Sequence, residues 1–189
     1  MTRKQSRAEF EHVMCPHLGS AYNLAMWLMR HPQDAEDAVQ TAYLKAYNAF
    51  DRFQGDYAAA WVLKIVRNTC LTALNKKNAD RTKVVSLDAA LSGSESHRII
   101  PFLHDTQAQP DANLAAKHER NLVHAAINRL PVDYREVVVL REFEDMTYQQ
   151  IADITEVPIG TIMSRLSRAR KALRELLSLS EDGGQRSEL

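Results

Sequence analysis

The residues best suited to chemistry in this chain are cationic side chains on one predicted helix. The segment Pro158–Arg174 holds no acid and five cations, which are Arg165, Arg168, Arg170, Lys171 and Arg174. Amphipathic surface helices usually balance such charges with Glu at i,i+4 spacing, and this segment contains no such partner. Its apolar positions recur at helical spacing, at Ile162, Leu166, Ala169 and Leu173. A helix with one apolar stripe and a cationic remainder fits the major groove of DNA, where phosphates attract the charges and short side chains reach base edges.

The sequence before this helix predicts a second, shorter helix that positions it. Thr147 and Gln150 have the spacing of a capping box, so the shorter helix is expected to begin at about Tyr148. The stretch Glu156–Pro158 interrupts it, because the residue before a proline is pushed out of the helical region. Pro158 suits the first turn of the following helix, where its missing N–H costs nothing. Together the two segments have the pattern of a DNA-binding helix-turn-helix.

Helical periodicity also describes the rest of the chain, and no strand-like alternation appears, so the expected fold class is all-α. The further helices are predicted at about Arg7–Arg30 with a bend near Pro16 and Gly19, from Asp34 as a cap to about Phe50, and at about Ala58–Lys77, Ala112–Arg129 and Val132–Phe143.

A change in composition predicts where the chain divides. Residues 83–111 contain several Ser, Gly and Pro, so we expect a flexible linker with little structure of its own. A loop of this length is rare inside a compact domain. It therefore favours two small helical domains, residues 1–82 and 112–179, of which the second contains the helix-turn-helix. Residues 180–189 are expected to form a disordered tail.

Charge is partitioned along the chain. Basic and acidic residues number 24 each, which argues against a protein that coats nucleic acid without selectivity. A second basic run, Lys64–Lys83, follows an acidic block, Asp34–Asp56. Two basic patches separated by acidic surfaces suggest two DNA contacts and at least one protein contact. Solvated charged faces explain the acidic block nearly as well.

The remaining residue types exclude several function classes. Cys15 and Cys70 lie in apolar helical contexts, which suggests a reducing compartment. His12, Cys15 and His17 lack a second ligand pair at structural-zinc spacing, so no metal is expected. No nucleophile elbow, phosphate loop or recognisable carboxylate pair is visible, so we expect no catalytic residues, no cofactor and no enzyme. No signal peptide is apparent and Leu18–Met29 is too short to span a membrane, so we expect a cytoplasmic protein without membrane insertion.

Four stretches of the chain carry a more specific signal together than any of them does alone: DAEDAVQTAYLKAY (34–47), AWVLKIVRNTCLTAL (60–74), LPVDYREVVVLREFEDMTYQQIA (130–152) and VPIGTIMSRLSRARKAL (157–173). One helix-turn-helix is generic among regulators, whereas these four stretches at this spacing are specific. In this order they resemble the extracytoplasmic-function (group IV) sigma factors of bacterial RNA polymerase.

The resemblance implies an alternative sigma factor that binds core RNA polymerase, directs it to specific promoters and aids melting of the −10 element. Residues 37–50 look like the segment that docks on the coiled coil of the β′ subunit. The implied contact residues are Asp37, Gln40, Thr41, Leu44 and Lys45. Thr41 departs from the acidic residue that is common at its position.

The third predicted helix and the loop before it resemble the element that melts and reads the −10 region. Asn68 matches the position that helps to hold a flipped base, with Phe53–Ala59 as the expected pocket wall. A base taken out of the stack needs such a polar partner and a fitted pocket. The residues implied to grip the strand backbone are Lys64, Arg67, Lys76 and Lys77.

Residues 130–173 resemble the domain that binds the β flap and reads the −35 element. Arg141 and Arg170 would contact phosphates, and the other implied contacts are Thr161, Met163, Ser164, Arg165, Ser167, Arg168 and Lys171. Met163 and Ser167 depart from the basic and larger side chains that are usual there, which implies either an unusual −35 sequence or two neutral contacts. In this family the linker threads towards the RNA exit path.

An anti-sigma factor that competes for the β′-binding and flap-binding faces is a further expected partner. Two rival functions remain. A stand-alone helix-turn-helix regulator of duplex DNA would need an effector or dimerisation module, which residues 1–77 do not resemble. A sigma mimic that sequesters an anti-sigma factor would not need the arginine-rich helix or Asn68, and the chain has both.

Overall fold

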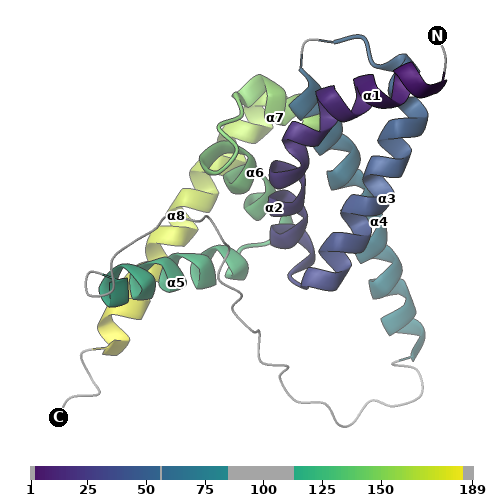
Figure 1. The fold of residues 1–189 in the computed structure, drawn as a ribbon. Coiled ribbons are helices and arrows are strands. Elements are labelled where there is room, and N and C mark those ends of the chain that lie inside the picture. The colour runs from purple at the N-terminus through teal and green to yellow at the C-terminus, as the bar shows by residue number, and fades with distance from the viewer. Residues whose placement is uncertain (1–2, 56, 85–112, 185–189) are drawn as a thin grey trace.

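The computed structural model describes residues 3–55, 57–84 and 113–184, and all regular elements in these ranges are helices, which confirms the all-α expectation. Figure 1 shows the first four long helices gathered on one side and the last four on the other. The elements are α1 (Arg3–Met14), the 3₁₀ turn η1 (Cys15–His17), α2 (Leu18–Met29), α3 (Pro32–Ala49), η2 (Phe50–Arg52), α4 (Ala58–Val84), α5 (Asn113–Arg129), α6 (Val132–Glu142), α7 (Tyr148–Thr155) and α8 (Ile159–Gly184).

The first half of the chain has the predicted order of helices, with one confirmed bend and two differences at helix ends. The expected bend in the first helix is confirmed, because Pro16 lies in the 3₁₀ turn that separates α1 from α2. Asp34 was expected to cap α3, and this is wrong: the cap is His31, in extended backbone, and Asp34 lies in the first turn. The carboxylate still suits this position, because the N-terminal end of a helix carries partial positive charge. Helix α4 continues to Val84, seven residues beyond the expected end at Lys77.

The second half begins one residue later than predicted, at Asn113, and contains the expected helix-turn-helix. The capping box is confirmed: Gln150 N–H donates to the Thr147 hydroxyl at 3.2 Å, and Thr147 N–H donates to the Gln150 side chain at 2.8 Å. Glu156 ends α7 in the left-handed region, with φ of 59°. The Pro158 carbonyl then accepts N–H bonds from Thr161 and Ile162 at 2.8 and 3.2 Å, which starts α8.

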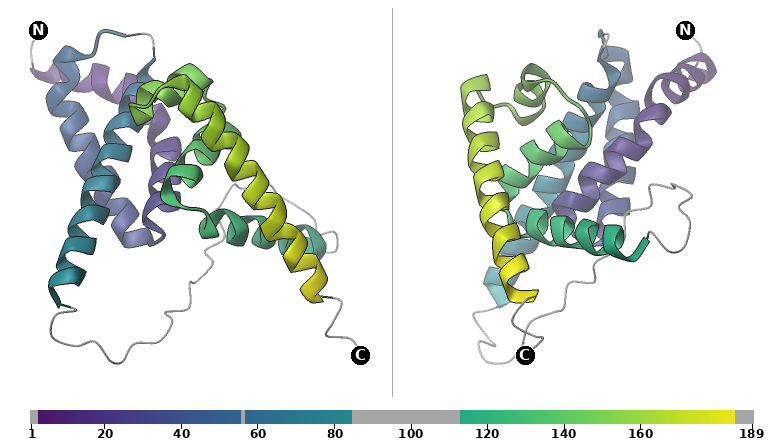
Figure 2. Two further views of the ribbon diagram at one scale, coloured as in Figure 1. Left: turned by 180° about the vertical axis from the view of Figure 1, so that it is seen from behind. Right: turned by 90° about the vertical axis from the view of Figure 1, so that its left-hand side faces the viewer.

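Helix α8 is longer than expected. It runs to Gly184, so residues 180–184 are helical although they were assigned to a disordered tail. Residues 83 and 84, assigned to the linker, also belong to a helix. The rest of the predicted linker, through residue 111, and the last five residues of the predicted tail lie outside the described residues. Figure 2 shows α8 as a long rod along one face of the molecule, with α5 crossing it near its C-terminal end.

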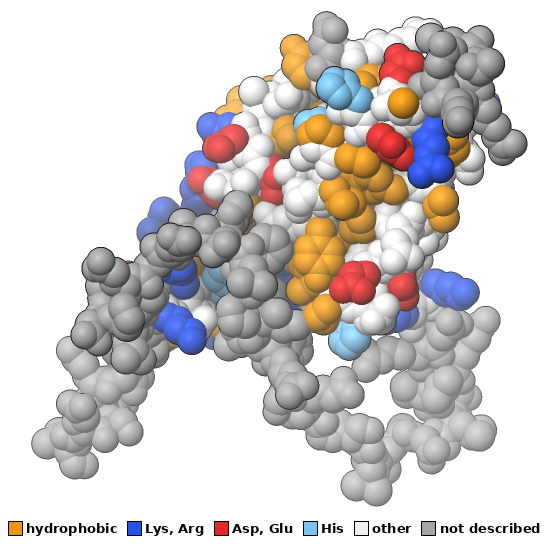
Figure 3. All heavy atoms as spheres, in the orientation of Figure 1, with side chains coloured by type: hydrophobic (Ala, Val, Ile, Leu, Met, Phe, Trp, Pro, Cys, Tyr) orange, Lys and Arg blue, Asp and Glu red, His pale blue; other side chains and the backbone are white. Residues whose placement is uncertain are grey.

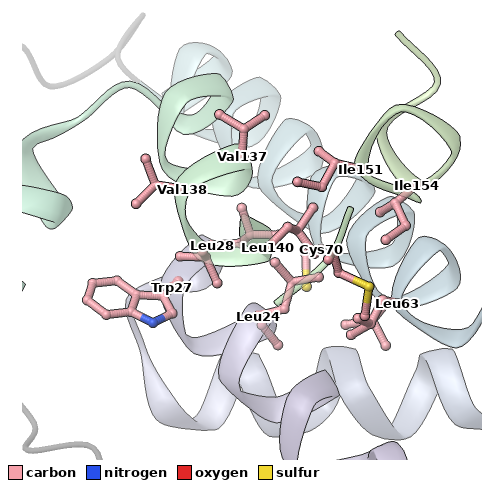
Figure 4. Close-up of a cluster of buried hydrophobic side chains, with 14 of the residues drawn as sticks. Leu24, Trp27, Leu28, Leu63, Cys70, Val137, Val138, Leu140, Ile151 and Ile154 are labelled. Atoms are coloured by element: carbon pink, nitrogen blue, oxygen red, sulfur yellow. The ribbon is translucent and has the colours of Figure 1, made fainter. Parts of the chain in front are cut away.

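The two halves share one hydrophobic core. Leu24 of α2 and Leu63 of α4 are fully buried in the same cluster as Leu140 of α6 and Ile151 of α7. Figure 4 shows these side chains converging from both halves of the chain. Direct packing between the halves was not predicted, because a linker of nearly thirty residues leaves the relative placement of its ends open. In the described parts of the chain, no helix is both long enough and apolar enough to cross a membrane.

The two cysteines differ in exposure, and this predicts different reactivity. Cys15 is exposed, whereas burial of Cys70 raises the pKa of its thiol to about 12. Only the thiolate reacts with an aromatic disulfide reagent, and at about pH 8 roughly one Cys70 thiol in ten thousand is ionised. We expect one fast-reacting thiol in the native protein and two in guanidinium chloride. The Cys15→Ser variant should have no fast-reacting thiol, and equal native rates for both thiols would contradict the buried position of Cys70.

Candidate nucleic-acid interface

Helix α8 presents one buried and one exposed face, as its sequence predicts. Ile162, Leu166 and Ala169 are at most 1% exposed and pack α8 against the other helices of the second half. Among the predicted base-reading positions, Met163 is 49% exposed, and Ser164, Ser167 and Arg168 are exposed as well. Figure 3 shows Lys and Arg side chains along the outer edge of the molecule where α8 runs. The fold therefore leaves the predicted base-reading positions exposed.

The arginines predicted to contact DNA beside this face have acidic partners from another helix. Arg165 donates to Asp133 at 3.0 Å and to Glu136 at 3.4 Å. Arg170 donates to Glu142 at 2.8 Å. The charge of α8 looked unbalanced in the sequence because its balancing acids come from α6, which lies about thirty residues earlier.

The remaining predicted contacts of the second half are Arg141, Lys171 and Thr161. Arg141, predicted to bind a phosphate, donates to the Met146 carbonyl at 2.8 Å and lies over the Tyr148 ring at 5.4 Å. Its guanidinium therefore fixes the turn that leads into α7. Lys171 lies 4.0 Å from Glu175, so a helical i,i+4 partner exists just beyond the segment without acids. Thr161 is half-buried at the start of α8.

The second predicted basic run lies on α4. Three of the four residues predicted to contact the strand backbone have ion-pair partners. Lys64 lies 2.8 Å from Glu156, and Lys77 lies 2.5 Å from Asp34. Arg67 binds Glu136 through two nitrogens, at 2.7 and 3.1 Å. The fourth residue, Lys76, is exposed.

Glu136 is the most enclosed charged group of the candidate interface. Its side chain is 1% exposed and accepts from both Arg67 and Arg165. Burial raises the pKa of this carboxyl, and the two guanidinium groups act against that rise. Removing one partner of a buried ion pair costs about 3–5 kcal/mol, because the other charge is left uncompensated. Glu136 therefore ties α4 and α8 to α6 at one point.

A pocket of about 280 Å³ opens beside the start of α4. Its wall includes Phe53, Gln54, Gly55 and Tyr57 from the predicted pocket loop. The other lining residues are Arg52, Ala60, Trp61, Lys64 and, from α7, Asp153. Drug-sized ligands occupy about 300–1,000 Å³, so this volume suits one small planar group. Asp56, which belongs to the same loop, lies outside the described residues.

Asn68, the predicted partner of a flipped base, lies one helical turn beyond Lys64 and does not line this pocket. It is exposed, and its side-chain oxygen accepts from Arg67 at 3.3 Å. The amide therefore borders the basic run of α4. In this arrangement the pocket and the amide are neighbours rather than parts of one cavity.

The residues predicted to contact the β′ coiled coil share one outward face of α3. Asp37, Gln40 and Thr41 are exposed, and Leu44 is 67% exposed although it is apolar. Lys45 is exposed too and donates to the Thr69 hydroxyl at 3.2 Å. The α3 face therefore combines one exposed apolar side chain with four polar ones.

Sequence reasoning missed the acidic partners Asp133, Glu136, Glu142 and Glu156. They stood in the acidic segment that precedes the basic helix, but nothing in their spacing indicated which cations they face. Among the described residues, no group of three or more His, Cys, Asp or Glu side chains is placed to hold a metal ion.

Two family models match the chain in the order of its two halves. Residues 16–79 match sigma-70 region 2, and residues 120–173 match sigma-70 region 4. The first match covers α2, α3 and most of α4, and the second ends within α8. The predicted contacts Lys64–Lys77 and Thr161–Lys171 therefore lie inside matched regions.

Curated relatives extend the match over most of the chain. The RNA polymerase sigma-H factor of Pseudomonas aeruginosa is 31% identical over 176 residues, 93% of this chain and 89% of the relative. The ECF RNA polymerase sigma-E factor of Escherichia coli K12 is 35% identical over 141 residues, 74% of this chain and 72% of the relative.

Solved structures match the fold as well. The sigma factor RpoE of Bartonella quintana, solved in complex with the anti-sigma factor NepR, has a TM-score of 0.69 at 29% identity and covers 90% of this chain and 97% of its own. CnrH, solved with the cytosolic domain of CnrY, shares the fold with a TM-score of 0.60 at 20% identity, over 92% of this chain and 90% of its own. With both sigma-70 regions matched in order and these relatives spanning most of the chain, the protein belongs to the extracytoplasmic-function sigma factors, the alternative sigma factors of transcription initiation.

Proposed function

We propose that this chain binds core RNA polymerase and directs it to a restricted set of promoters by contacting the −10 and −35 elements. The observation that carries the proposal is that regions 2 and 4 occur in order, each with a basic run on a helix suited to DNA. We propose residues 1–82 and 112–179 as the two functional units. No covalent chemistry is assigned to this chain, and bond formation belongs to the polymerase.

The outward face of α3 is the proposed contact with the β′ coiled coil. Exposure of Leu44 among Asp37, Gln40, Thr41 and Lys45 supports this role, because such a surface combines an apolar anchor with a polar rim. The apolar side of α3 is buried in the first half, so substitutions on the outward face leave the core intact.

The pocket beside α4 is the proposed binding site for a flipped −10 base. Phe53, Tyr57 and Trp61 supply ring faces on which a base can stack. Asn68 borders the path that the strand would take, and the cations Lys64, Arg67, Lys76 and Lys77 are proposed to hold its backbone.

The exposed face of α8 is the proposed reader of the −35 element. Met163, Ser164, Ser167 and Arg168 are placed to reach base edges in a major groove. Arg141, Arg165, Arg170 and Lys171 are proposed to contact phosphates once released from their present partners, with Thr161 at the helix start. The second half is also proposed to bind the β flap.

An anti-sigma factor is proposed as a further partner, and the cytoplasm as the place of action. The solved complex of RpoE from Bartonella quintana with NepR supports the first point. The second follows from the proposed work with RNA polymerase on chromosomal DNA.

Run-off transcription on a promoter library tests the proposed function, with purified core polymerase in the presence and absence of this protein. Initiation that depends on the protein, from start sites sharing a −35/−10 pair, is the expected result. Tight core binding without initiation from any template would contradict promoter selection. Duplex DNA binding without core binding would favour the stand-alone regulator, and binding of neither would favour the mimic.

Reversing charge on the α3 face should weaken polymerase binding. The double variant Asp37→Arg/Gln40→Arg is expected to bind core at least about tenfold more weakly, because interface centres tolerate mismatched charges poorly. Its helicity should be unchanged, since both side chains are exposed. Fluorescence anisotropy of labelled protein with core measures the affinity. Asp51→Arg, also an exposed acid, is the matched control, and equal affinity of the double variant and the wild type would remove this face from the proposal.

Truncating Arg168 should reduce use of the −35 element. Arg168→Ala is expected to lose about 1–3 kcal/mol of promoter binding if the side chain contacts a base. Run-off yields on matched templates with and without a −35 element measure the effect. Arg174→Ala removes an exposed cation two turns further along α8 and serves as the control. An equal loss for Arg168→Ala on both templates would show that the side chain does not read sequence.

A further inference from the structure

The outward surface of α8 begins with two exposed apolar side chains. Ile159 is 40% exposed and Met163 is 49% exposed. Seven large apolar side chains are exposed in the described parts of the chain, and of these only Ile159 and Met163 lie four positions apart on one helix. Residues at this spacing are neighbours on a helix surface, so the pair forms one apolar strip. Apolar residues scattered singly over a surface need no explanation, and these two are not scattered singly.

A glycine lies beside the apolar strip. Gly160 is exposed, and a Cβ atom at this position would meet no neighbouring element within 4 Å. Its φ is not positive, so neither packing nor backbone conformation requires a glycine. A glycine inside a helix is nevertheless less stable than an alanine would be. Its effect here is to let another molecule approach the backbone of α8 closely.

A serine one turn further along α8 borders the glycine on its other side. The Ser164 hydroxyl donates to the Thr161 carbonyl at 2.9 Å. With its hydrogen used in this way, the oxygen offers only lone pairs to a base. In a major groove the matching donors are the amino groups of adenine and cytosine. The start of α8 therefore combines an apolar strip, an open backbone and one acceptor.

The exposed cations of α8 stand beyond this uncharged surface. Arg168, Arg170 and Lys171 are exposed, whereas the earlier Arg165 is half-buried and donates to Asp133. Charge complementarity thus directs phosphates to the later turns of the helix, and the apolar strip is continuous with that cationic surface. The residues near the start of a recognition helix are the ones that contact base edges. The apolar group that base pairs present in a major groove is the C5-methyl of thymine.

We propose that the apolar strip reads thymine. Ile159 and Met163 cover C5-methyl groups in the −35 element, and Gly160 lets the helix backbone approach the groove closely enough for this contact. The inference rests on the proposed function, because it names the base that α8 reads. It also assigns a role to Met163, which stands where a basic residue is usual: the substitution changes the preferred −35 sequence and is not a neutral contact.

Replacement of thymine by 2′-deoxyuridine tests the contact, because it removes the methyl group and leaves the hydrogen-bonding groups unchanged. The probe is a fluorescein-labelled promoter duplex recovered in the run-off experiment, with each −35 thymine on either strand replaced in turn. Fluorescence anisotropy measures binding of the holoenzyme. At least one replacement should weaken binding about fourfold, as expected for one buried methyl group. A thymine in the spacer between the two elements is the control and should tolerate the change.

The Met163→Ala variant links the methyl group to the strip. Its affinity ratio between the thymine and deoxyuridine probes should fall from about fourfold to nearly one, because the side chain that senses the methyl is gone. Val123→Ala shortens another exposed apolar side chain of the second half, on α5, and should keep the wild-type ratio. If Met163→Ala binds too weakly for the ratio to be measured, Ile159→Ala replaces it. Circular dichroism checks that each variant is folded.

The Gly160→Ala variant tests the close approach. It should raise the melting temperature, because alanine is the better helix former and the new methyl group meets no neighbouring element. It should nevertheless weaken binding of the thymine probe by about fivefold or more, since an added methyl group in a close contact displaces its partner. Gly19→Ala is the matched control. Gly19 is also exposed in the first turn of a helix, α2, with open space around it, so this variant should be stabilised without a change in affinity.

The outcomes separate failure of thymine reading from failure of the proposed function. Equal affinities for thymine and deoxyuridine at every −35 position would overturn thymine reading alone, as would a selected −35 element without thymine on either strand. Discrimination that persists in Met163→Ala would overturn the assignment to the strip. Loss of core binding by Met163→Ala with an unchanged probe ratio would assign the strip to the polymerase instead. Failure of the holoenzyme to bind the unmodified duplex would overturn the proposed function and thymine reading with it.

Discussion

The Glu136 carboxylate is removed from water at the junction of three helices, and cations from two sides must offset the cost of that burial. Arg67 arrives from α4 and Arg165 from α8, so the position of each helix is tied to the same pair of oxygens. Isolated charges are expensive to bury, and replacing a buried ion pair by apolar residues is often neutral or stabilising. The cluster therefore contributes alignment more than stability. It sets which face of α4 meets α6, and the apolar core around it supplies the favourable free energy.

This division between alignment and stability bears on how the two halves could come apart. The cations of the junction can exchange one set of oxygens for another at modest net cost, because carboxylates and phosphates offer a guanidinium the same geometry. The apolar contacts of Trp27 and Leu140 have no substitute in DNA. Nucleic acid alone therefore offers no replacement for the apolar part of this interface.

Local features of the fold could be predicted from the sequence, and long-range ones could not. The capping box at Thr147 and Gln150 involves residues three positions apart, so its spacing is visible in the chain and the structure confirms it. The end of α4 was predicted at Lys77, seven residues too early, although neither Gly nor Pro follows before Val84. The Arg67–Glu136 pair joins residues 69 positions apart, and no periodicity relates them. Helical periodicity in the sequence was enough to place the predicted DNA contacts on helices. The acids that pair with them could be identified only from the tertiary structure.

The core shared by the two halves has a consequence for the lifetime of the protein in a cell. If the halves came apart, Leu28, Val138 and Leu140, each at most 2% exposed in the folded chain, would lose part of their cover. A chain opened in this way would present the surface to proteases and to other opened chains. Turnover would then remove opened molecules before compact ones, so the packing of the halves would also protect the chain from degradation.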